Sequence, residues 1–211
     1  MKKQIQQLKN LVQKILTRLM FGRYLKGLHA GSLVIDCGAN VGDITTKLAA
    51  TGAEVHAFEP NPFAFEVLKK RVGENPKVHL HPKGVWDKHT RTDLYFHEGT
   101  SSGDEAFWAF GSSILAEKGN VLKGKSVEVE IIDLTEFIEG LDRTVDLLKI
   151  DIEGAECELL EKFIAKGLHH KVKQTLVETH DSKIPGQKVK TDKVRALIRE
   201  QGIRNINLNW L

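Results

Sequence analysis

Short apolar runs alternate with amphipathic stretches along most of this chain of 211 residues. Five apolar runs have the length of strands: residues 33–36, 54–58, 78–80, 145–150 and 175–178. Four stretches between or after them have helical spacing: about 42–50, 62–72, 155–165 and 191–201. The run at 145–150 is apolar almost throughout, which is typical of a strand buried on both faces. The alternation predicts an α/β fold with a mostly parallel sheet and helices on both of its faces.

The middle of the chain departs from this repeat. Residues 91–97 alternate between apolar and polar and are expected to pair antiparallel with residues 84–87. Residues 127–131 have the pattern of a half-buried strand, and residues 203–210 that of a closing strand. Residues 99–124 are rich in glycine and serine and have no steady period, so a long functional loop is expected there. The sequence therefore predicts an antiparallel insertion in the α/β fold.

The amino-terminal segment has the pattern of an amphipathic helix. Its apolar residues follow helical spacing: Ile5, Leu8, Leu11, Val12, Ile15, Leu16 and Leu19. The polar positions of residues 2–20 include lysines and an arginine and no acid. Two interpretations are open: the helix packs over the domain or the mouth of its site, or it contacts a membrane surface or a partner subunit. We expect a helical extension over residues 1–28 and a single domain over residues 29–211.

Composition narrows the class of protein. A content of 41% hydrophobic and 28% charged residues is ordinary for a soluble globular protein. The net charge of +3 is too small to indicate a nucleic-acid partner. No apolar run reaches the length of about 18 residues that a membrane span needs. The apolar residues near the amino terminus are spaced rather than continuous, so we expect no secretory signal. The two cysteines have no metal-binding spacing, so a reducing cytoplasm is the expected location.

The first two apolar runs end in a pattern typical of nucleoside binding. The run at 33–36 ends in Asp36, and the turn that follows contains Gly38 and Gly42. The second run ends just before Glu59. Glycines let a ligand lie against the backbone, and a carboxylate at the end of the second strand can accept both hydroxyls of a ribose. Because neighbouring parallel strands end at the same edge of a sheet, both features are expected at one crevice.

The turn does not fit a dinucleotide cofactor. A G-x-G-x-x-G fingerprint that starts at Gly38 would need glycines at positions 40 and 43, where the chain has Asn40 and Asp43. Asp36 and Asp43 would repel a pyrophosphate. S-adenosylmethionine has no phosphate and carries a sulfonium and an ammonium group, which suit acidic and amide side chains. The residues therefore favour S-adenosylmethionine over a nicotinamide.

Three segments together resemble the FkbM family of S-adenosylmethionine-dependent methyltransferases. They are residues 34–43, 57–62 and 147–156, and the resemblance extends from about Gly31 to about His180. The third segment, which contains Lys-Ile-Asp-Ile-Glu-Gly-Ala-Glu, is the most specific to the family. The resemblance implies a Rossmann-like class I methyltransferase fold and methylation of a hydroxyl on a sugar, a glycan or a small natural product.

Candidate cofactor-binding residues follow from the turn, the second strand and the general fold. Glu59 is expected to bind the ribose. Asn40 is expected to bind the amino-acid end of the cofactor or to cap the next helix, and the two roles are compatible. Asp36 is expected either to orient the turn or to face the ammonium group. The adenine is expected near residues 83–86, where Trp86 is expected in the core. The full set is Asp36, Gly38, Asn40, Gly42, Glu59, Pro60, Gly84, Val85 and Asp151.

Candidate catalytic residues lie after the last two apolar runs. Asp151, Glu178 and His180 are expected to converge where the methyl group is transferred, because ligands bind beyond the carboxyl ends of parallel strands. Methyl transfer is an in-line displacement, so the protein aligns the acceptor and accepts its proton. Asp151 and His180 are the candidate bases, and an unperturbed histidine titrates near neutral pH. The same trio can hold a divalent metal, although the sequence does not require one. Glu153 and Glu156 either bind substrate or favour the start of a helix, and Lys149 is expected to pair with one of the acids.

The long loop carries candidate substrate contacts. Trp108 suits stacking on a sugar or an aromatic acceptor, and Ser112 and Ser113 lie where the family often has a serine near the substrate; Glu153 completes this set. The aromatic residues of the loop can equally form a lid over the core. His79 and His81 are expected to be a surface pair. Two alternative functions remain open. One is N-methylation on the same scaffold, and the other is the role of a non-catalytic cofactor-binding accessory protein in a polysaccharide pathway.

Overall fold

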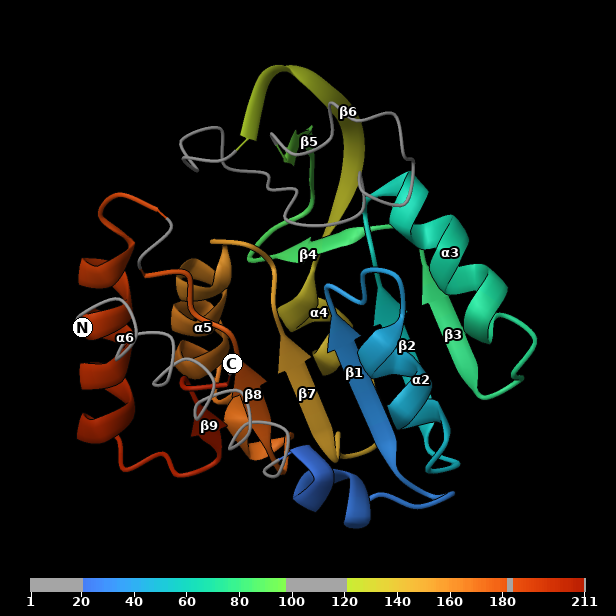
Figure 1. Cartoon of the computed structure of the whole chain (residues 1–211). Coiled ribbons are helices and arrows are strands. Elements are labelled where there is room, and N and C mark those ends of the chain that lie inside the picture. Colours follow the sequence, from blue (N-terminus) through green and yellow to red (C-terminus); the bar gives the residue numbers. More distant parts are fainter. Residues whose placement is uncertain (1–20, 98–120, 182–183, 211) are drawn as a thin grey trace, which may run out of the picture.

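The computed structural model describes residues 21–97, 121–181 and 184–210, and the side chains of all of these except 97 and 121–125. A six-stranded sheet forms its centre (Figure 1). Its strands are β1 (Leu33–Cys37), β2 (Glu54–Phe58), β3 (Val78–His81), β7 (Leu147–Ile150), β8 (Thr175–Val177) and β9 (Ile206–Asn207). The order is β3-β2-β1-β7-β8-β9, and each neighbouring pair is parallel. The predicted parallel sheet is confirmed, and its order reverses between β1 and β7, where such sheets bind ligands.

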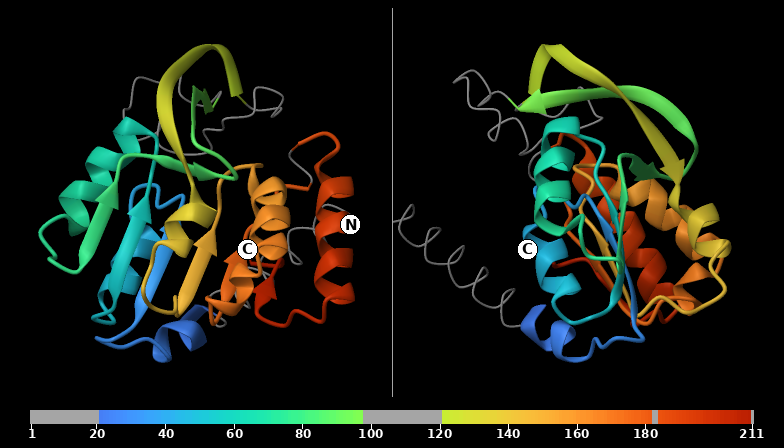
Figure 2. Two further views of the ribbon diagram at one scale, coloured as in Figure 1. Left: turned by 180° about the vertical axis from the view of Figure 1, so that it is seen from behind. Right: turned by 90° about the vertical axis from the view of Figure 1, so that its right-hand side faces the viewer.

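Helices cover both faces of the sheet, as predicted (Figure 2). One face carries α2 (Asp43–Ala49) and α3 (Pro62–Val72), and the other carries α4 (Leu134–Glu139), α5 (Glu156–Ala165) and α6 (Gln187–Glu200). A 3₁₀ turn, η3 (Leu168–His170), follows α5. No helix in the described part of the chain is both long and apolar enough to cross a membrane.

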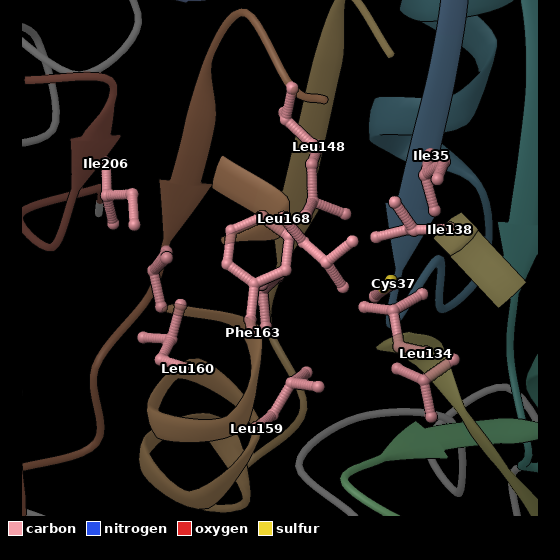
Figure 3. Close-up of a cluster of buried hydrophobic side chains, with 14 of the residues drawn as sticks. Ile35, Cys37, Leu134, Ile138, Leu148, Leu159, Leu160, Phe163, Leu168 and Ile206 are labelled. Atoms are coloured by element: carbon pink, nitrogen blue, oxygen red, sulfur yellow. The ribbon is translucent and has the colours of Figure 1, made fainter. Parts of the chain in front are cut away.

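Two apolar cores result from the alternation of side chains along the strands. In β1, Leu33, Ile35 and Cys37 pack against α4 and α5, while Val34 faces α2 and α3. Figure 3 shows the first of these cores, which Phe163 of α5 fills from the helix side. Because consecutive residues of a strand point to opposite faces, β1 and β7 need apolar residues at nearly every position, as their burial confirms.

The first described residues of the chain pack in the second core. A helical segment at residues 21–26 packs there, with Phe21 buried and its ring centroid 5.0 Å from that of Trp210. The predicted amphipathic helix of residues 4–20 lies outside the described residues.

A second sheet lies beyond the carboxyl ends of the main strands (Figure 1). It consists of β4 (Gly84–Trp86), β5 (Thr90–His97) and β6 (Val121–Asp133), in the order β4-β6-β5. An antiparallel insertion is therefore present, but the predicted pairing of residues 91–97 with 84–87 is wrong. β5 pairs antiparallel with β6, and β4 pairs parallel with β6 on its other side.

The pairing follows from the side chains of β6. Its residues Val129 and Ile131 are buried, with Leu94 of β5 in the same cluster. A Cβ on Gly84 would lie 2.4 Å from the Cδ1 of Ile131, so the glycine lets β4 approach this strand. The long strand β6 thus takes the central position.

Several elements also differ from the prediction. β6 begins at Val121, inside the loop expected at 99–124, and extends past the strand expected at 127–131. α4 follows it at a position where the sequence pattern predicts no helix. The helix expected at 191–201 begins at Gln187, directly after Gly186, whose φ of 78° suits glycine. The closing strand expected at 203–210 pairs with β8 only at Ile206 and Asn207.

Candidate active site

The turn after β1 fits closely between other parts of the protein. Gly38 has a φ of 77°, and a Cβ there would lie 1.8 Å from the carbonyl oxygen of Asp151. Gly42 has a φ of 91°, and its Cβ would lie 2.8 Å from the Cδ1 of Leu68 in α3. The sequence pattern predicts that both glycines make room for a cofactor. In the structure, their lack of a side chain lets the turn pack against the end of β7 and against α3.

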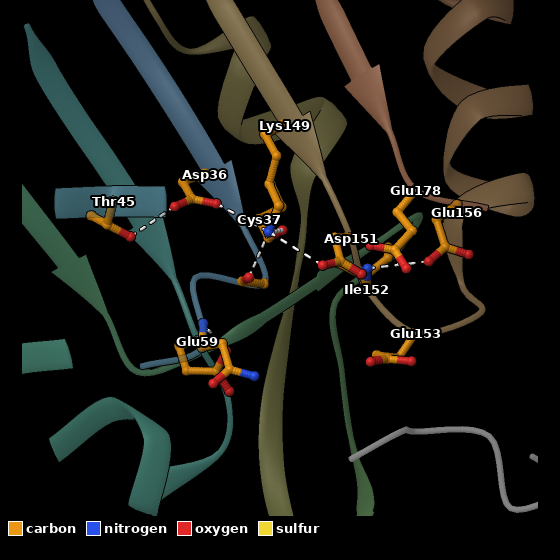
Figure 4. Close-up of polar contacts among 12 residues, drawn as sticks. Asp36, Cys37, Thr45, Glu59, Lys149, Asp151, Ile152, Glu153, Glu156 and Glu178 are labelled. Atoms are coloured by element: carbon orange, nitrogen blue, oxygen red, sulfur yellow. Dashed lines mark hydrogen bonds and ion pairs between the residues drawn. The ribbon is translucent and has the colours of Figure 1, made fainter. Parts of the chain in front are cut away.

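Asp36 and Lys149 stabilise this turn from the strands β1 and β7. The fully buried Asp36 accepts a hydrogen bond from the hydroxyl of Thr45 at 2.7 Å, and its other oxygen lies 3.3 Å from the Nζ of Lys149 (Figure 4). Lys149 donates to the carbonyl oxygens of Gly38 at 2.6 Å and Cys37 at 3.2 Å. Of the two roles open for Asp36, these contacts support orientation of the turn.

Lys149 also connects the turn to the candidate catalytic edge. Its Nζ lies 3.6 Å from the Oδ2 of Asp151, which confirms the expected pairing with an acid. Burial alone would lower the pKa of Lys149, but Asp36 and Asp151 raise it, so the side chain stays a cation. No sequence pattern indicates that one lysine contacts both carboxylates, because the register of Asp36 with Lys149 across β1 and β7 appears only in the sheet.

Glu59 is held in place by two backbone amides. Its Oε2 accepts from the N–H of Asn40, and its Oε1 accepts from the N–H of Asn61, both at 2.8 Å. Each carboxylate oxygen keeps a second acceptor position, because it has two lone pairs. Burial raises the pKa of Glu59 to about 7, against the hydrogen bonds from Asn61 and Asn40. The structure thus fixes the direction of a buried acceptor beside the turn (Figure 4).

Asn40 shapes the turn rather than capping the next helix. It has a φ of 51°, and its Oδ1 accepts from the N–H of Val41 at 2.7 Å. The N-cap of α2 is Gly42, so the capping role is wrong, and a contact with the cofactor stays a prediction.

The segment expected at the adenine lies next to the end of β2. A Cβ on Gly84 would be 3.5 Å from Pro60, which places these two predicted residues side by side. The side chain of Val85 is buried in the first core, so only its backbone can meet a ligand. Trp86 packs against the same core, as expected. The Nζ of Lys88 lies over its ring, 4.3 Å from the centroid.

The three predicted catalytic residues converge at the carboxyl ends of β7 and β8. The Nε2 of the buried His180 lies 3.8 Å from the Oδ1 of Asp151 and 3.8 Å from the Oε1 of Glu178. The same nitrogen is 3.0 Å from the Oε2 of Glu153, and the Nδ1 is 3.0 Å from the Oε1 of Glu156. A single imidazole is therefore surrounded by four carboxyl groups.

Glu156 has a larger part than the sequence analysis gave it. Its Oε1 accepts from the backbone N–H of Ile152 at 3.1 Å and of Gly154 at 3.0 Å. These bonds close the loop after β7, in which Glu153 adopts a φ of 58°. The carboxylate is buried, so it fixes both this loop and the ring of His180.

Gln187 of α6, which no sequence signal singled out, supports the same loop by donating to the carbonyl oxygen of Gly154 at 2.9 Å.

The electrostatics of the cluster separate the two candidate bases. Burial alone would lower the pKa of His180, but hydrogen bonds and charge from Glu153 and Glu156 raise it to about 10. Burial raises the pKa of Asp151 to about 6; Glu178 and Glu153 add to this effect and Lys149 opposes it. The imidazole is thus a cation at neutral pH, and Asp151 is the group that can take up a proton in this range.

The cluster also has the donor set of a metal site. One ligand atom each of Asp151, Glu178 and His180 lies within 4.8 Å of the other two. The two carboxylates are about one-fifth to one-quarter exposed, so they reach the surface while His180 does not. The predicted substrate residues Trp108, Ser112 and Ser113 lie outside the described residues.

Comparisons with known proteins place the chain in a family. Residues 36–204 match the family model described as the methyltransferase FkbM domain. Methyltransferase sdnD of Sordaria araneosa is 27% identical over 190 residues, covering 74% of this chain and 69% of the relative. The 31-O-demethyl-FK506 methyltransferase FkbM of Streptomyces tacrolimicus is 26% identical over 193 residues, covering 81% and 74%.

A solved structure gives a similar fold. Methyltransferase FkbM from Methylobacillus flagellatus KT superposes with a TM-score of 0.50 at 15% identity. The match covers 84% of this chain and 38% of that one, so this chain spans well under half the length of that protein.

Proposed function

The chain belongs to the FkbM methyltransferase family and is a methyltransferase; from this premise we propose that S-adenosylmethionine is its methyl donor and a hydroxyl group its acceptor. The acceptor we propose is a sugar, a glycan or a small natural product. The proposal rests on one observation. Glu59, which can accept hydrogen bonds from ribose hydroxyls, and Asp151, which can accept a proton, lie on the two sides of the same turn. Lys149 joins the two sides through contacts to the turn and to Asp151.

The residues around the turn fit such a cofactor. Glu59 presents fixed acceptor positions for the two ribose hydroxyls. Asp36 and Asp43 disfavour a pyrophosphate at the start of α2, even though Asp43 pairs with Arg71. When bound, S-adenosylmethionine supplies an electrophilic methyl group on a cationic sulfur, and the acidic residues 151, 153 and 178 make the nearby edge suitable for a cation.

The acceptor would be aligned and deprotonated at the strand ends. Asp151 is the group we assign to the acceptor proton, because its pKa of about 6 leaves it ionised at neutral pH and able to take up a proton. His180 is the positioning residue: Glu156 fixes its ring, and its charge holds Asp151, Glu153 and Glu178 together.

Isothermal titration tests the donor directly. S-adenosylhomocysteine should bind at micromolar strength or tighter, and NAD should give no heat. Mass spectrometry of products formed from labelled S-adenosylmethionine with a panel of glycans and small hydroxyl compounds would then identify the acceptor. Labelled amines instead of labelled hydroxyl compounds would point to N-methylation, and binding with no product would point to an accessory role.

A metal-assisted version of the reaction has its own support in the Asp151, Glu178 and His180 trio. A divalent cation held there would bind the acceptor oxygen and lower its pKa. Chelation should then abolish turnover, and magnesium or manganese should restore it. Turnover that survives chelation would exclude this version and leave Asp151 as the proton acceptor.

A further inference from the structure

A second group of possible ligands lies nearer the amino ends of the strands, away from the methyl-transfer edge. Glu54 and His56 of β2 and His79 and His81 of β3 occupy alternate positions, so they share the sheet face that α4 covers. His56 and His79 are register partners in the parallel pair, and their ring centroids are 4.7 Å apart. The sequence pattern predicts a surface pair of His79 and His81. It does not indicate His56, because only the register of β2 against β3 brings this ring beside them.

Two of the distances are close to those between the ligands of a tetrahedral zinc site. The Oε1 of Glu54 lies 3.3 Å from the Nε2 of His79 and 3.6 Å from the Nε2 of His56. Zinc–nitrogen and zinc–oxygen bonds of about 2.0–2.1 Å place neighbouring tetrahedral ligands about 3.3 Å apart. All three ligand atoms lie within 4.8 Å of one another, so small movements would complete the geometry.

Neighbouring side chains hold two of these ligands from behind. The Nδ1 of His56 is 3.1 Å from the Nε2 of His81, whose ring is stacked on Phe58 at a centroid distance of 4.2 Å. A proton on that Nδ1 would leave the Nε2 of His56 free to bind a metal. Arg143 donates to the Oε2 of Glu54 at 2.7 Å, which leaves the Oε1 facing the two imidazoles. Partners of this kind orient the ligands of metal sites.

We propose that Glu54, His56 and His79 form a zinc-binding site that links the edge strand β3 to β2. Two imidazoles and one carboxylate suit zinc and its neighbours in the first transition series, unlike the more oxygen-rich trio at Asp151. The side chain of His79 is 45% exposed, so the fourth position opens to water. β3 pairs with a single strand of the main sheet, and a metal shared with β2 would stabilise this edge.

Zinc titration against a chromophoric chelator would test the site in the full-length protein after removal of metal. We expect one zinc per chain, and His79→Gln and Glu54→Gln should weaken binding by at least about 100-fold, more than the loss of an outer partner does. His81→Phe, which keeps an aromatic ring on Phe58 but removes the acceptor for His56, should weaken binding about 10–100-fold. Cobalt in place of zinc should give the absorption of a tetrahedral site, and His79→Gln should lose it.

Two controls separate this site from others. His89 is an exposed histidine 3.0 Å from Glu136, so His89→Gln should keep wild-type zinc affinity. Asp151→Asn should keep it as well, because Asp151 belongs to the other cluster. Zinc should also raise the melting temperature of the wild type more than that of His79→Gln. Absence of zinc binding by the wild type, or equal affinity in the wild type and His79→Gln, would overturn the proposal.

Discussion

The carboxylate of Glu59 is oriented before any ligand binds, because the amides of Asn40 and Asn61 each hold one of its oxygens. A ligand hydroxyl therefore meets an acceptor whose position costs no further side-chain entropy. The same principle operates at His180, which Glu156 orients from the side opposite to Asp151.

Replacement of Glu59 tests the ribose assignment. Glu59→Ala should weaken the binding of S-adenosylhomocysteine by about 1.5–3 kcal/mol, the range for hydrogen bonds to a charged group. Isothermal titration measures this loss, and Glu74→Ala, at an exposed position of the α3–β3 connection, should leave the affinity unchanged. Thermal melting of both variants shows whether the turn itself has loosened. An unaltered dissociation constant in folded Glu59→Ala would remove Glu59 from the cofactor site.

The assignment of Asp151 as proton acceptor predicts a pH profile. Turnover should rise as the pH rises through about 6, because Asp151 must lose its own proton before it can accept another. Asp151→Asn should retain affinity for S-adenosylhomocysteine and lose turnover by a factor on the order of 10² or more. Asp142→Asn, at an exposed position, is the matched control. If Asp151→Asn kept both its rate and its rising limb, the proton acceptor would have to be another group.

At the scale of elements, the turn from β1 to α2 is where the main strands and the site meet. Gly38 lies against the carbonyl oxygen of Asp151, so the turn and the end of β7 are packed as one unit. The positions of Asp36, Glu59 and Asp151 thus depend on the same contact.

A pair of glycine variants separates backbone strain from packing at this contact. Gly38 and Gly202 both have positive φ, at 77° and 64°, but a Cβ on Gly202 would have nothing within 4 Å. Gly202→Ala should therefore lower the free energy of unfolding by only the cost of a left-handed residue, about 1–2 kcal/mol. Gly38→Ala should lose a further 1–3 kcal/mol or so from overpacking, because a backbone carbonyl blocks it. Urea denaturation compares the two, and equal losses would mean that the turn can move away from β7.

The amino-terminal extension that we propose for residues 1–28 reaches the core at its end, where Phe21 is buried beside Trp210. We expect the predicted helix before it to pack on the domain as well, since its apolar stripe needs to be buried. Deletion of residues 1–20 should then lower the melting temperature and increase the binding of a hydrophobic dye. An unchanged melting temperature together with lost vesicle or partner binding would favour the other interpretation.

At the scale of the whole molecule, the buried charges make stability depend on pH. Below pH 7 the effects oppose each other: burial lowers the pKa of His81 to about 4, whereas burial raises that of Glu59 to about 7. Above pH 7 the effect has one sign. The pKa of His180 is raised to about 10, so the native state binds more protons than the unfolded state in this range.

The free energy of unfolding should therefore fall as the pH rises from 7 to 10. The contribution of His180 is fully present below its unfolded pKa of about 6.5 and is lost as the pH rises through about 10. Burial raises the pKa of Cys157 from 9.0 to about 11, so this thiol adds to the slope only above pH 9. Urea denaturation in the presence of a chelator should give a flatter profile for His180→Gln than for the wild type. The exposed His89→Gln should keep the slope, and a wild-type profile without one would contradict the charged state of His180.

The order of apolar runs predicts the main sheet, the helices α2, α3, α5 and α6 and the residues at the strand ends, but not the short helix α4. Asp36, Glu59, Asp151 and Glu178 could be placed because apolar runs mark the strands and parallel strands end at one edge. This information is local and needs only the spacing of residues within each segment. The motifs around these residues also identified the family, which the match over residues 36–204 confirms.

Contacts between residues far apart in the chain appear only in the folded protein. The pairing of β6 with both β4 and β5 depends on the packing of Ile131 and Gly84, and no periodicity encodes it. The bond of Glu156 to His180 and the stack of His56 on His79 depend on register between segments far apart in the chain. The raised pKa of His180 likewise depends on burial and on charges brought from other elements, because desolvation and Coulomb energy are set by distances in space.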